Sequence, residues 1–153
     1  MKSIAFSFLL ATGCFVPAPV RAQSSPLFLR HFMRDVLNPR IPESDIIDTY
    51  LCHYLHEVPD KAENKNYAFA RGQITGIRAY TQQEKMTAAQ FKIYKYADIP
   101  SQDQTLLLEE TNNVYVCYYN NALFNFLLVN RHRIDSFTTL NKAGRHFFIS
   151  YCQ

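Results

Sequence analysis

One predicted strand carries the residues best placed to do chemistry. Residues 90–99 alternate in type, and the polar face of this run carries Lys92, Tyr94, Tyr96 and Asp98. A carboxylate on a rigid strand can act as a general base, and a nearby lysine can stabilise a phosphate. The solvent-facing side of a half-buried sheet explains the same pattern without any chemistry.

A second candidate group follows the predicted strand 123–130. Asn130, Arg131 and His132 lie where this strand ends, and a basic group at a strand end can contact phosphate. A solvated turn is the alternative interpretation. The sequence contains no nucleophile-elbow, zinc-protease or glycine-rich phosphate-loop motif, so it predicts no cofactor.

Three cysteines remain once the N-terminal segment, which contains Cys14, is set aside. Cys52, Cys117 and Cys152 allow three pairings. We favour Cys52–Cys152, because it ties the first predicted strand to the end of the chain. Cys117 lies in an apolar run and is expected to be a buried free thiol. Since no CxxC or His/Cys cluster has metal-ligand spacing, no metal site is predicted.

The start of the chain reads as a signal peptide over residues 1–22. Lys2 precedes a short apolar run, and Val20, Arg21 and Ala22 fit a cleavage site. The remaining 131 residues carry 14 basic and 13 acidic side chains, a formal charge of +1. This near-neutral balance argues against a dedicated nucleic-acid binder, so any RNA binding should be weak and salt-sensitive. We expect a secreted protein with no membrane partner, because no later apolar stretch could span a bilayer.

The elements that must position the candidates follow from periodicity and turn signals. Residues 23–47 are expected to form an N-terminal extension with a short helix, and residues 48–153 to form the main domain. One helix is predicted at 61–73. Predicted strands cover 50–54, 74–80, 90–99, 105–109, 114–119, 123–130 and 146–152. This order predicts an α+β fold with one α-helix packed on a twisted antiparallel β-sheet.

A resemblance to a known family follows from four features together. These are the Tyr50-x-Cys52 motif, the near-terminal Cys152, one helix after the first strand, and the ending Phe-Phe-Ile-Ser-Tyr-Cys. Over residues 50–152 the chain resembles the ribonuclease-like secreted effectors of powdery mildew fungi, the RNase-like proteins associated with haustoria. These are relatives of the guanyl-preferring fungal ribonucleases. The resemblance implies a microbial ribonuclease-like fold and the Cys52–Cys152 disulfide.

The same resemblance implies that catalysis is lost. Residues 96–100 are similar to the ribonuclease strand that carries the catalytic base, with Asp98 one methylene short of glutamate. The catalytic arginine would fall near residues 114–116, where the chain has none. The catalytic histidine is replaced by Asn130, with His132 two residues beyond. No residue is therefore expected to be catalytic, and the candidates are a remnant site or a binding face.

The resulting hypothesis is a non-enzymatic virulence effector. It would be delivered into the host plant cell, bind host proteins as a monomer, and be open to recognition by an immune receptor as an avirulence determinant. RNA is a weaker candidate partner. One alternative is an active secreted ribonuclease that uses Asp98 and His132. Another is a cystatin-like protease inhibitor, since residues 73–76 (Gln-Ile-Thr-Gly) are similar to the Q-x-V-x-G inhibitory loop.

Overall fold

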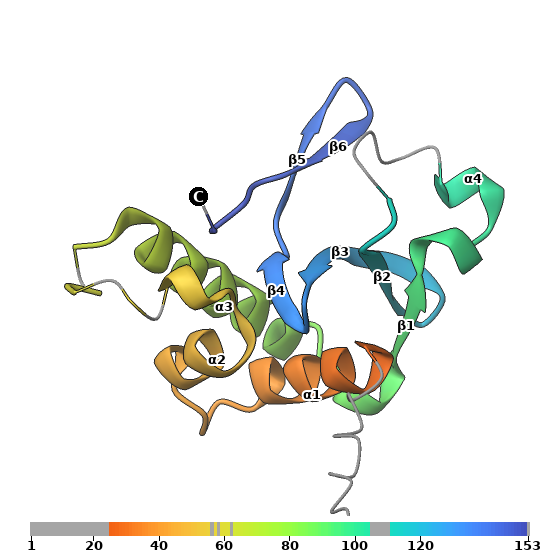
Figure 1. Cartoon of the computed structure of the whole chain (residues 1–153). Coiled ribbons are helices and arrows are strands. Elements are labelled where there is room, and N and C mark those ends of the chain that lie inside the picture. Colours follow the sequence, from red (N-terminus) through yellow and green to blue (C-terminus); the bar gives the residue numbers. More distant parts are fainter. Residues whose placement is uncertain (1–24, 56, 58, 62, 105–110, 153) are drawn as a thin grey trace, which may run out of the picture.

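The protein is an α+β structure with an antiparallel sheet, as the sequence predicts (Figure 1). The prediction of one helix packed on that sheet is wrong, because several helices cover one face. The computed structural model describes residues 25–55, 57, 59–61, 63–104 and 111–152. The predicted signal peptide and the predicted strand 105–109 lie outside the described residues. Within the described part, no helix has both the length and the apolar content needed to cross a membrane.

Three helices form the covering layer. They are α1 (Ser25–Leu37), α2 (Glu43–Tyr50) and α3 (Lys65–Gln83). Helix α1 buries side chains at i, i+3, i+4 and i+7, namely Leu29, Phe32, Met33 and Val36. The helix predicted within 23–47 is thus confirmed, and it packs into the main core rather than standing apart from it.

Two predicted strands are wrong. Residues 50–54 form the end of α2 and the 3₁₀ turn η1 (His53–Leu55), and only Leu51 makes a β-bridge, to Ile134. The predicted helix 61–73 begins only at Lys65, and it continues through the predicted strand 74–80 as one helix, α3. Its residues Ala70, Ile74 and Arg78 recur at helical spacing and are buried, so tertiary packing outweighs the local strand preference.

The main sheet has the order β1-β2-β3-β4, with antiparallel neighbours. Its strands are β1 (Phe91–Lys95), β2 (Val114–Tyr119), β3 (Ala122–Asn130) and β4 (Arg133–Ser136). Strands β5 (Thr139–Lys142) and β6 (Arg145–Phe148) form a separate hairpin. The strand predicted at 90–99 ends early, because the 3₁₀ turn η3 (Tyr96–Asp98) begins after Lys95. The strand predicted at 146–152 likewise ends at Phe148.

The two faces of the sheet bury different clusters. We call the larger one the helix-side core; it joins α1, α2 and α3 to alternate sheet residues such as Ile93, Cys117 and Leu127. The smaller one, the hairpin-side cluster, lies on the opposite face beneath β6. Its members are Tyr96, Ile99, Val114, Val116, Tyr118 and Phe126, with Leu123, Leu128 and Phe148 packed against them. The alternation of a pleated strand accounts for this division.

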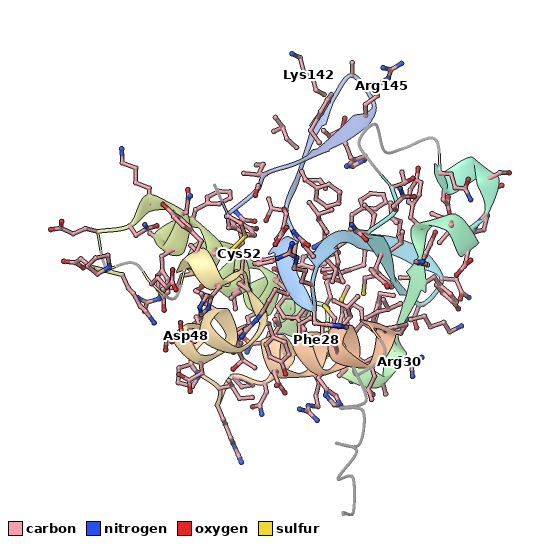
Figure 2. The ribbon with its side chains drawn as sticks, viewed as in Figure 1. Phe28, Arg30, Asp48, Cys52, Lys142 and Arg145 are labelled. Atoms are coloured by element: carbon pink, nitrogen blue, oxygen red, sulfur yellow. A yellow bond between two sulfur atoms is a disulfide. The ribbon has the colours of Figure 1, made fainter. Side chains whose placement is uncertain are left out.

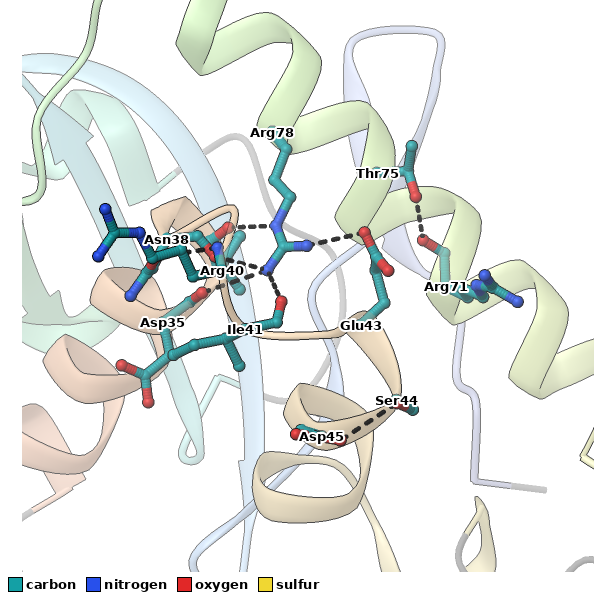
Figure 3. A network of polar contacts seen from close by, with 11 residues as sticks. Asp35, Asn38, Arg40, Ile41, Glu43, Ser44, Asp45, Arg71, Thr75 and Arg78 are labelled. Carbon is teal, nitrogen blue, oxygen red and sulfur yellow. Dashed lines mark hydrogen bonds and ion pairs between the residues drawn. The ribbon is translucent and has the colours of Figure 1, made fainter.

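Covalent and polar contacts tie the helix-side core together. Cys52 and Cys152 form a disulfide with a Cα–Cα distance of 6.0 Å, which confirms the favoured pairing (Figure 2), and Cys117 is a buried free thiol. The guanidinium of buried Arg78 on α3 donates 2.7 Å bonds to the Val36 carbonyl and to Glu43 Oε1. It also donates to the carbonyls of Asp35, Asn38 and Ile41, so one side chain closes the α1–α2 connection (Figure 3).

Candidate functional site

Two of the four candidates from residues 90–99, Tyr94 and Asp98, line one side of a shallow groove, which we call the tyrosine groove; Lys92 and Tyr96 are not among its lining residues. The groove has a volume of about 340 Å³ and lies between β1, β2 and the short helix α4 (Ser101–Gln104). Its lining residues are Tyr94, Asp98, Ile99, Pro100, Gln102, Asp103, Tyr118 and Asn121. Gln104 holds the groove's floor in place, since its side chain donates a 2.9 Å bond to the Ile99 carbonyl.

The alternation expected along β1 holds only to the end of the strand. Lys92 and Tyr94 are exposed, and Tyr94 retains 44% of its surface. Tyr96, expected on the same face, is only 5% exposed and belongs to the hairpin-side cluster. The backbone turns at η3, so the strand period of two no longer applies beyond Lys95. Asp98 lies in that turn and is exposed.

The polar contacts in the tyrosine groove include two residues that sequence reasoning missed. Tyr118 Oη donates a 2.6 Å bond to Asp103 Oδ2, and its ring meets Tyr94 edge-on with centroids 6.0 Å apart. Burial, with the Asp103 carboxylate, raises the pKa of Tyr118 well above its ordinary value. Tyr118 therefore stays a hydrogen-bond donor at neutral pH. The alternation of β2 could have placed Tyr118 on this face, but nothing in the sequence pairs it with Asp103.

Asn130, Arg131 and His132 lie elsewhere, at the turn between β3 and β4. Arg131 and His132 have φ values of 44° and 65°, the left-handed conformation of a two-residue hairpin turn. This conformation is uncommon for side chains of their size, so the turn is held by the pairing of its flanking strands. The sequence prediction that these residues follow a strand end is confirmed.

This turn borders a second hollow beside the disulfide, which we call the disulfide hollow; its volume is about 320 Å³. It is lined by Cys52, His53, Tyr54, Asn130, Arg131, Arg133, Asp135 and Cys152. Arg133 Nη1 donates to the carbonyls of Asp48 and Thr49, so its charge closes the C-terminal end of α2. Burial raises the pKa of Asp135, and a hydrogen bond from the Asn130 side chain partly offsets this.

In the disulfide hollow, the possible metal-ligand atoms of Cys52, Asp135 and Cys152 lie within 4.8 Å of one another. Among the described residues, this is the one group of three such side chains close enough to share a metal ion. Both sulfur atoms are committed to the disulfide. They offer no thiolate, which is the form of cysteine that binds a metal. This cluster is therefore structural in the oxidised protein.

The structure does not bring the two sets of candidates into one hollow. Asp98 lines the tyrosine groove, whereas Asn130 and Arg131 line the hollow beside the disulfide. Strands β2 and β3 separate β1 from the β3–β4 turn, and neighbouring strands lie about 4.8 Å apart. Between them the sheet presents Val114, Val116 and Phe126, all buried in the hairpin-side cluster.

The fold and its surfaces define a disulfide-linked α+β protein with shallow polar grooves at the edges of its sheet. The chain matches no protein-family model, no curated protein and no solved structure.

Proposed function

We propose that this protein is a secreted, non-catalytic fungal effector with a ribonuclease-like ancestry. It acts inside the host plant cell by binding host protein and is open to recognition by an immune receptor. RNA is a secondary partner in this proposal. The proposal rests on the sequence motifs of the resemblance over residues 50–152 and on the export signal predicted at residues 1–22. The strand at 50–54 that contributed to the resemblance is not formed, since these residues are the end of α2 and the turn η1.

One structural observation supports the loss of catalysis more than any other. The strand positions where the resemblance would place a catalytic arginine are occupied by Val114 and Val116, both 0% exposed beneath the β5–β6 hairpin. An arginine there would have to enter an apolar cluster without a partner, which is costly. Asp98 and the Asn130–His132 turn stand on either side of this apolar surface and do not share a hollow.

The segment on which the cystatin-like alternative depends, residues 73–76, is helical rather than a loop. Gln73, Ile74, Thr75 and Gly76 lie inside α3, and Ile74 is fully buried. A helical segment anchored in the core by Ile74 cannot insert into a protease cleft as an inhibitory loop. The observed disulfide also joins distant segments, Cys52 and Cys152.

A cleavage assay tests the proposal against an active ribonuclease. Protein purified after secretion, with the disulfide formed, is incubated with single-stranded RNA beside the double variant Asp98→Asn, His132→Ala. We expect no difference between the two proteins. RNA cleavage by the wild type that disappears in the double variant would overturn the non-catalytic proposal in favour of the ribonuclease.

A second assay tests delivery and binding. The chain from residue 23 is produced inside plant cells, and its host partners are captured by proximity labelling. We expect a reproducible set of labelled host proteins that a destabilised Arg78→Leu variant does not give. Labelling identical to that of an unrelated secreted protein would argue against a host-binding role.

A further inference from the structure

A groove between α1 and β1 differs in character from the candidate surfaces described above. We call it the α1–β1 groove; its volume is about 480 Å³. Its walls are α1 on one side and β1 with the preceding 3₁₀ turn η2 (Ala88–Gln90) on the other (Figure 1). The lining residues are Arg30, His31, Met33, Arg34, Ala88, Ala89, Phe91, Lys92 and Ile93. None of these was a candidate from the sequence except Lys92.

The rim of the α1–β1 groove is basic. Arg30, Arg34 and Lys92 are exposed, His31 is half-buried, and no lining residue is acidic. Figure 2 labels Arg30 on α1, beside β1. Arg34 shares its charge with Asp35 through a 2.8 Å ion pair, and Lys92 Nζ reaches Asn121 Oδ1 at 3.2 Å. The tyrosine groove is the opposite case, since Asp98 and Asp103 line it. The protein as a whole is nearly neutral, so this local excess of basic side chains makes the α1–β1 groove favourable for a negatively charged ligand.

The floor of the groove is apolar and runs along the edge of the sheet. Met33, Phe91 and Ile93 are buried, and the alanines of η2 extend the apolar strip. Strand β1 pairs with β2 on one side only, and no other strand of the described chain pairs with its outer edge. An unpaired edge presents main-chain donors and acceptors at regular spacing and is a template for an added strand.

The charges on β1 decide which strand could be added. Lys92 and Lys95 are both exposed on this five-residue strand. Two copies of β1 side by side would bring like charges together, which disfavours edge-to-edge pairing of this protein with itself. A strand with acidic side chains would meet Lys92, Lys95 and Arg30 favourably.

We propose that the α1–β1 groove binds an extended acidic peptide segment of a partner protein, which pairs with β1 as an added strand. The proposal rests on the non-catalytic binding role above and gives it a surface and a partner chemistry. Alternate apolar side chains of the peptide would lie on the floor formed by Met33 and Ile93. Its carboxylates would lie at the rim beside Arg30, Arg34 and Lys92.

A peptide fits this groove better than RNA does. Binding of single-stranded RNA without sequence reading depends on exposed aromatic rings on which bases stack. The one phenyl ring in the lining belongs to Phe91 and is only 7% exposed. The exposed ring nearest along β1, that of Tyr94, lines the tyrosine groove instead.

The test uses a fluorescent peptide of about eight residues, with alternating glutamate and valine, which is long enough to pair along β1. Its affinity is measured by fluorescence polarisation, and its site by changes in the backbone amide spectrum of the isotope-labelled protein. We expect saturable binding, amide changes concentrated in β1 and α1, and weaker binding as salt is added. A lysine–valine peptide should not bind. If binding does not saturate by about 1 mM peptide, the dissociation constant exceeds about 1 mM and the binding free energy is weaker than about 4 kcal/mol. That result would overturn the proposal.

Two modified reagents separate strand addition from simple charge attraction. A glutamate–valine peptide with alternate N-methylated backbone nitrogens keeps its charge but loses main-chain donors, and it should bind at least about tenfold more weakly. The double variant Arg30→Glu, Lys92→Glu should also weaken binding of the unmodified peptide by about tenfold or more. The matched control Lys142→Glu, Arg145→Glu reverses two exposed charges on the remote β5–β6 hairpin (Figure 2) and should change it less than about twofold.

The same reagents define the results that would contradict the proposal. Equal binding of the N-methylated peptide, or equal effects of the two double variants, would overturn strand addition in this groove. A single-stranded RNA that displaces the peptide and binds more tightly would reassign the groove to nucleic acid. Peptide binding by a protein that also cleaves RNA would keep the groove and refute only the non-catalytic role.

Discussion

The two faces of the main sheet are built by different means. On the helix side, three helices, the disulfide and the Arg78 network close the core. On the hairpin side, six buried residues are covered by β6 and η3, without a disulfide among the described residues. The helix side therefore carries most of the stability, and the hairpin side is a cover that could open with less loss of structure.

The comparison also explains where the candidate binding surfaces lie. Both faces of the sheet are occupied by apolar packing, so the polar hollows are left to its margins. The tyrosine groove and the α1–β1 groove border β1, and the disulfide hollow borders the β3–β4 turn. Such margins suit the binding of protein segments rather than enclosure of a small substrate.

Removal of the disulfide should give the largest loss of stability. The bond joins residues 100 apart in the sequence. In the chain-entropy model a loop of that length contributes about 4.7 kcal/mol. We expect the double variant Cys52→Ala, Cys152→Ala to lower the free energy of unfolding by about this amount in urea titrations. The single variant Cys117→Ala is the matched control, because Cys117 is buried but unbonded. Equal losses from the two variants would mean that the disulfide does not anchor the helix side.

Arg78→Leu should also be strongly destabilising. The leucine keeps some apolar bulk but leaves the carbonyls of Val36 and Ile41, and the Glu43 carboxylate, without their donor. Losing the charged member of such a buried set costs about 3 kcal/mol. Calorimetry should show a lowered Tm with the same overall secondary structure by circular dichroism. Thr75→Val is a matched control on α3, because the Thr75 hydroxyl donates only within the helix, to Arg71. A loss below that of the control would show that the α1–α2 connection holds without Arg78.

Phenylalanine truncation on the two faces tests the comparison directly. Phe32 is fully buried in the helix-side core, and Phe148 is half-buried against the hairpin-side cluster. Phe32→Ala should lower the free energy of unfolding by about 3–5 kcal/mol. Phe148→Ala should lower it by about 1–2 kcal/mol, because folding buries less of the Phe148 side chain. Hydrogen exchange should speed up mainly in β5 and β6 for Phe148→Ala, and across the protein for Phe32→Ala. Global acceleration by Phe148→Ala would mean that the two faces unfold as one unit.

The sequence predicted the parts whose signals are local. Residues 114–119 and 123–130 are apolar runs joined by Asn120 and Asn121, a pair suited to a two-residue hairpin turn, and both strands are confirmed. Gly72 is typical of a helix end, so the predicted helix stops at residue 73 and leaves out the second half of α3. A glycine that ends a helix usually has a positive φ, whereas Gly72 does not and lies inside α3, so the helix continues through it.

The surfaces were harder to predict than the elements. Alternation along β1 placed Lys92 and Tyr94 on one face, but it could not show that the chain turns after Lys95 and buries Tyr96. The α1–β1 groove joins Arg30 to Lys92, which are distant in the sequence, so it depends on how α1 packs. Contacts of this kind follow from tertiary structure and leave no pattern within a single element.

A matched pair of tyrosine hydroxyls gives the smallest and sharpest test. Tyr50 Oη donates to Asp35 Oδ2 at 2.5 Å on the helix side, and Tyr118 Oη donates to Asp103 Oδ2 at 2.6 Å on the other. Tyr50→Phe should cost about 1.5 kcal/mol at neutral pH, the value of a bond to a charged group. Tyr118→Phe should cost less, because Asp103 lies on the four-residue helix α4 and can turn to water.

The pH dependence of Tyr50→Phe shows whether the Tyr50 hydrogen bond depends on the charge of Asp35. Burial raises the pKa of Asp35, but hydrogen bonds from Arg34 and Tyr50 outweigh it, so the net pKa lies below its ordinary value. A carboxyl whose pKa is lowered by folding stabilises the protein above its unfolded pKa, and that stability is lost as the pH falls through the folded pKa. The difference in unfolding free energy between wild type and Tyr50→Phe should therefore be largest near neutral pH and shrink in acid. Phenylalanine keeps the ring contacts with Phe28 and Phe32, so a difference that stays constant with pH would assign the effect to the hydroxyl without the Asp35 charge.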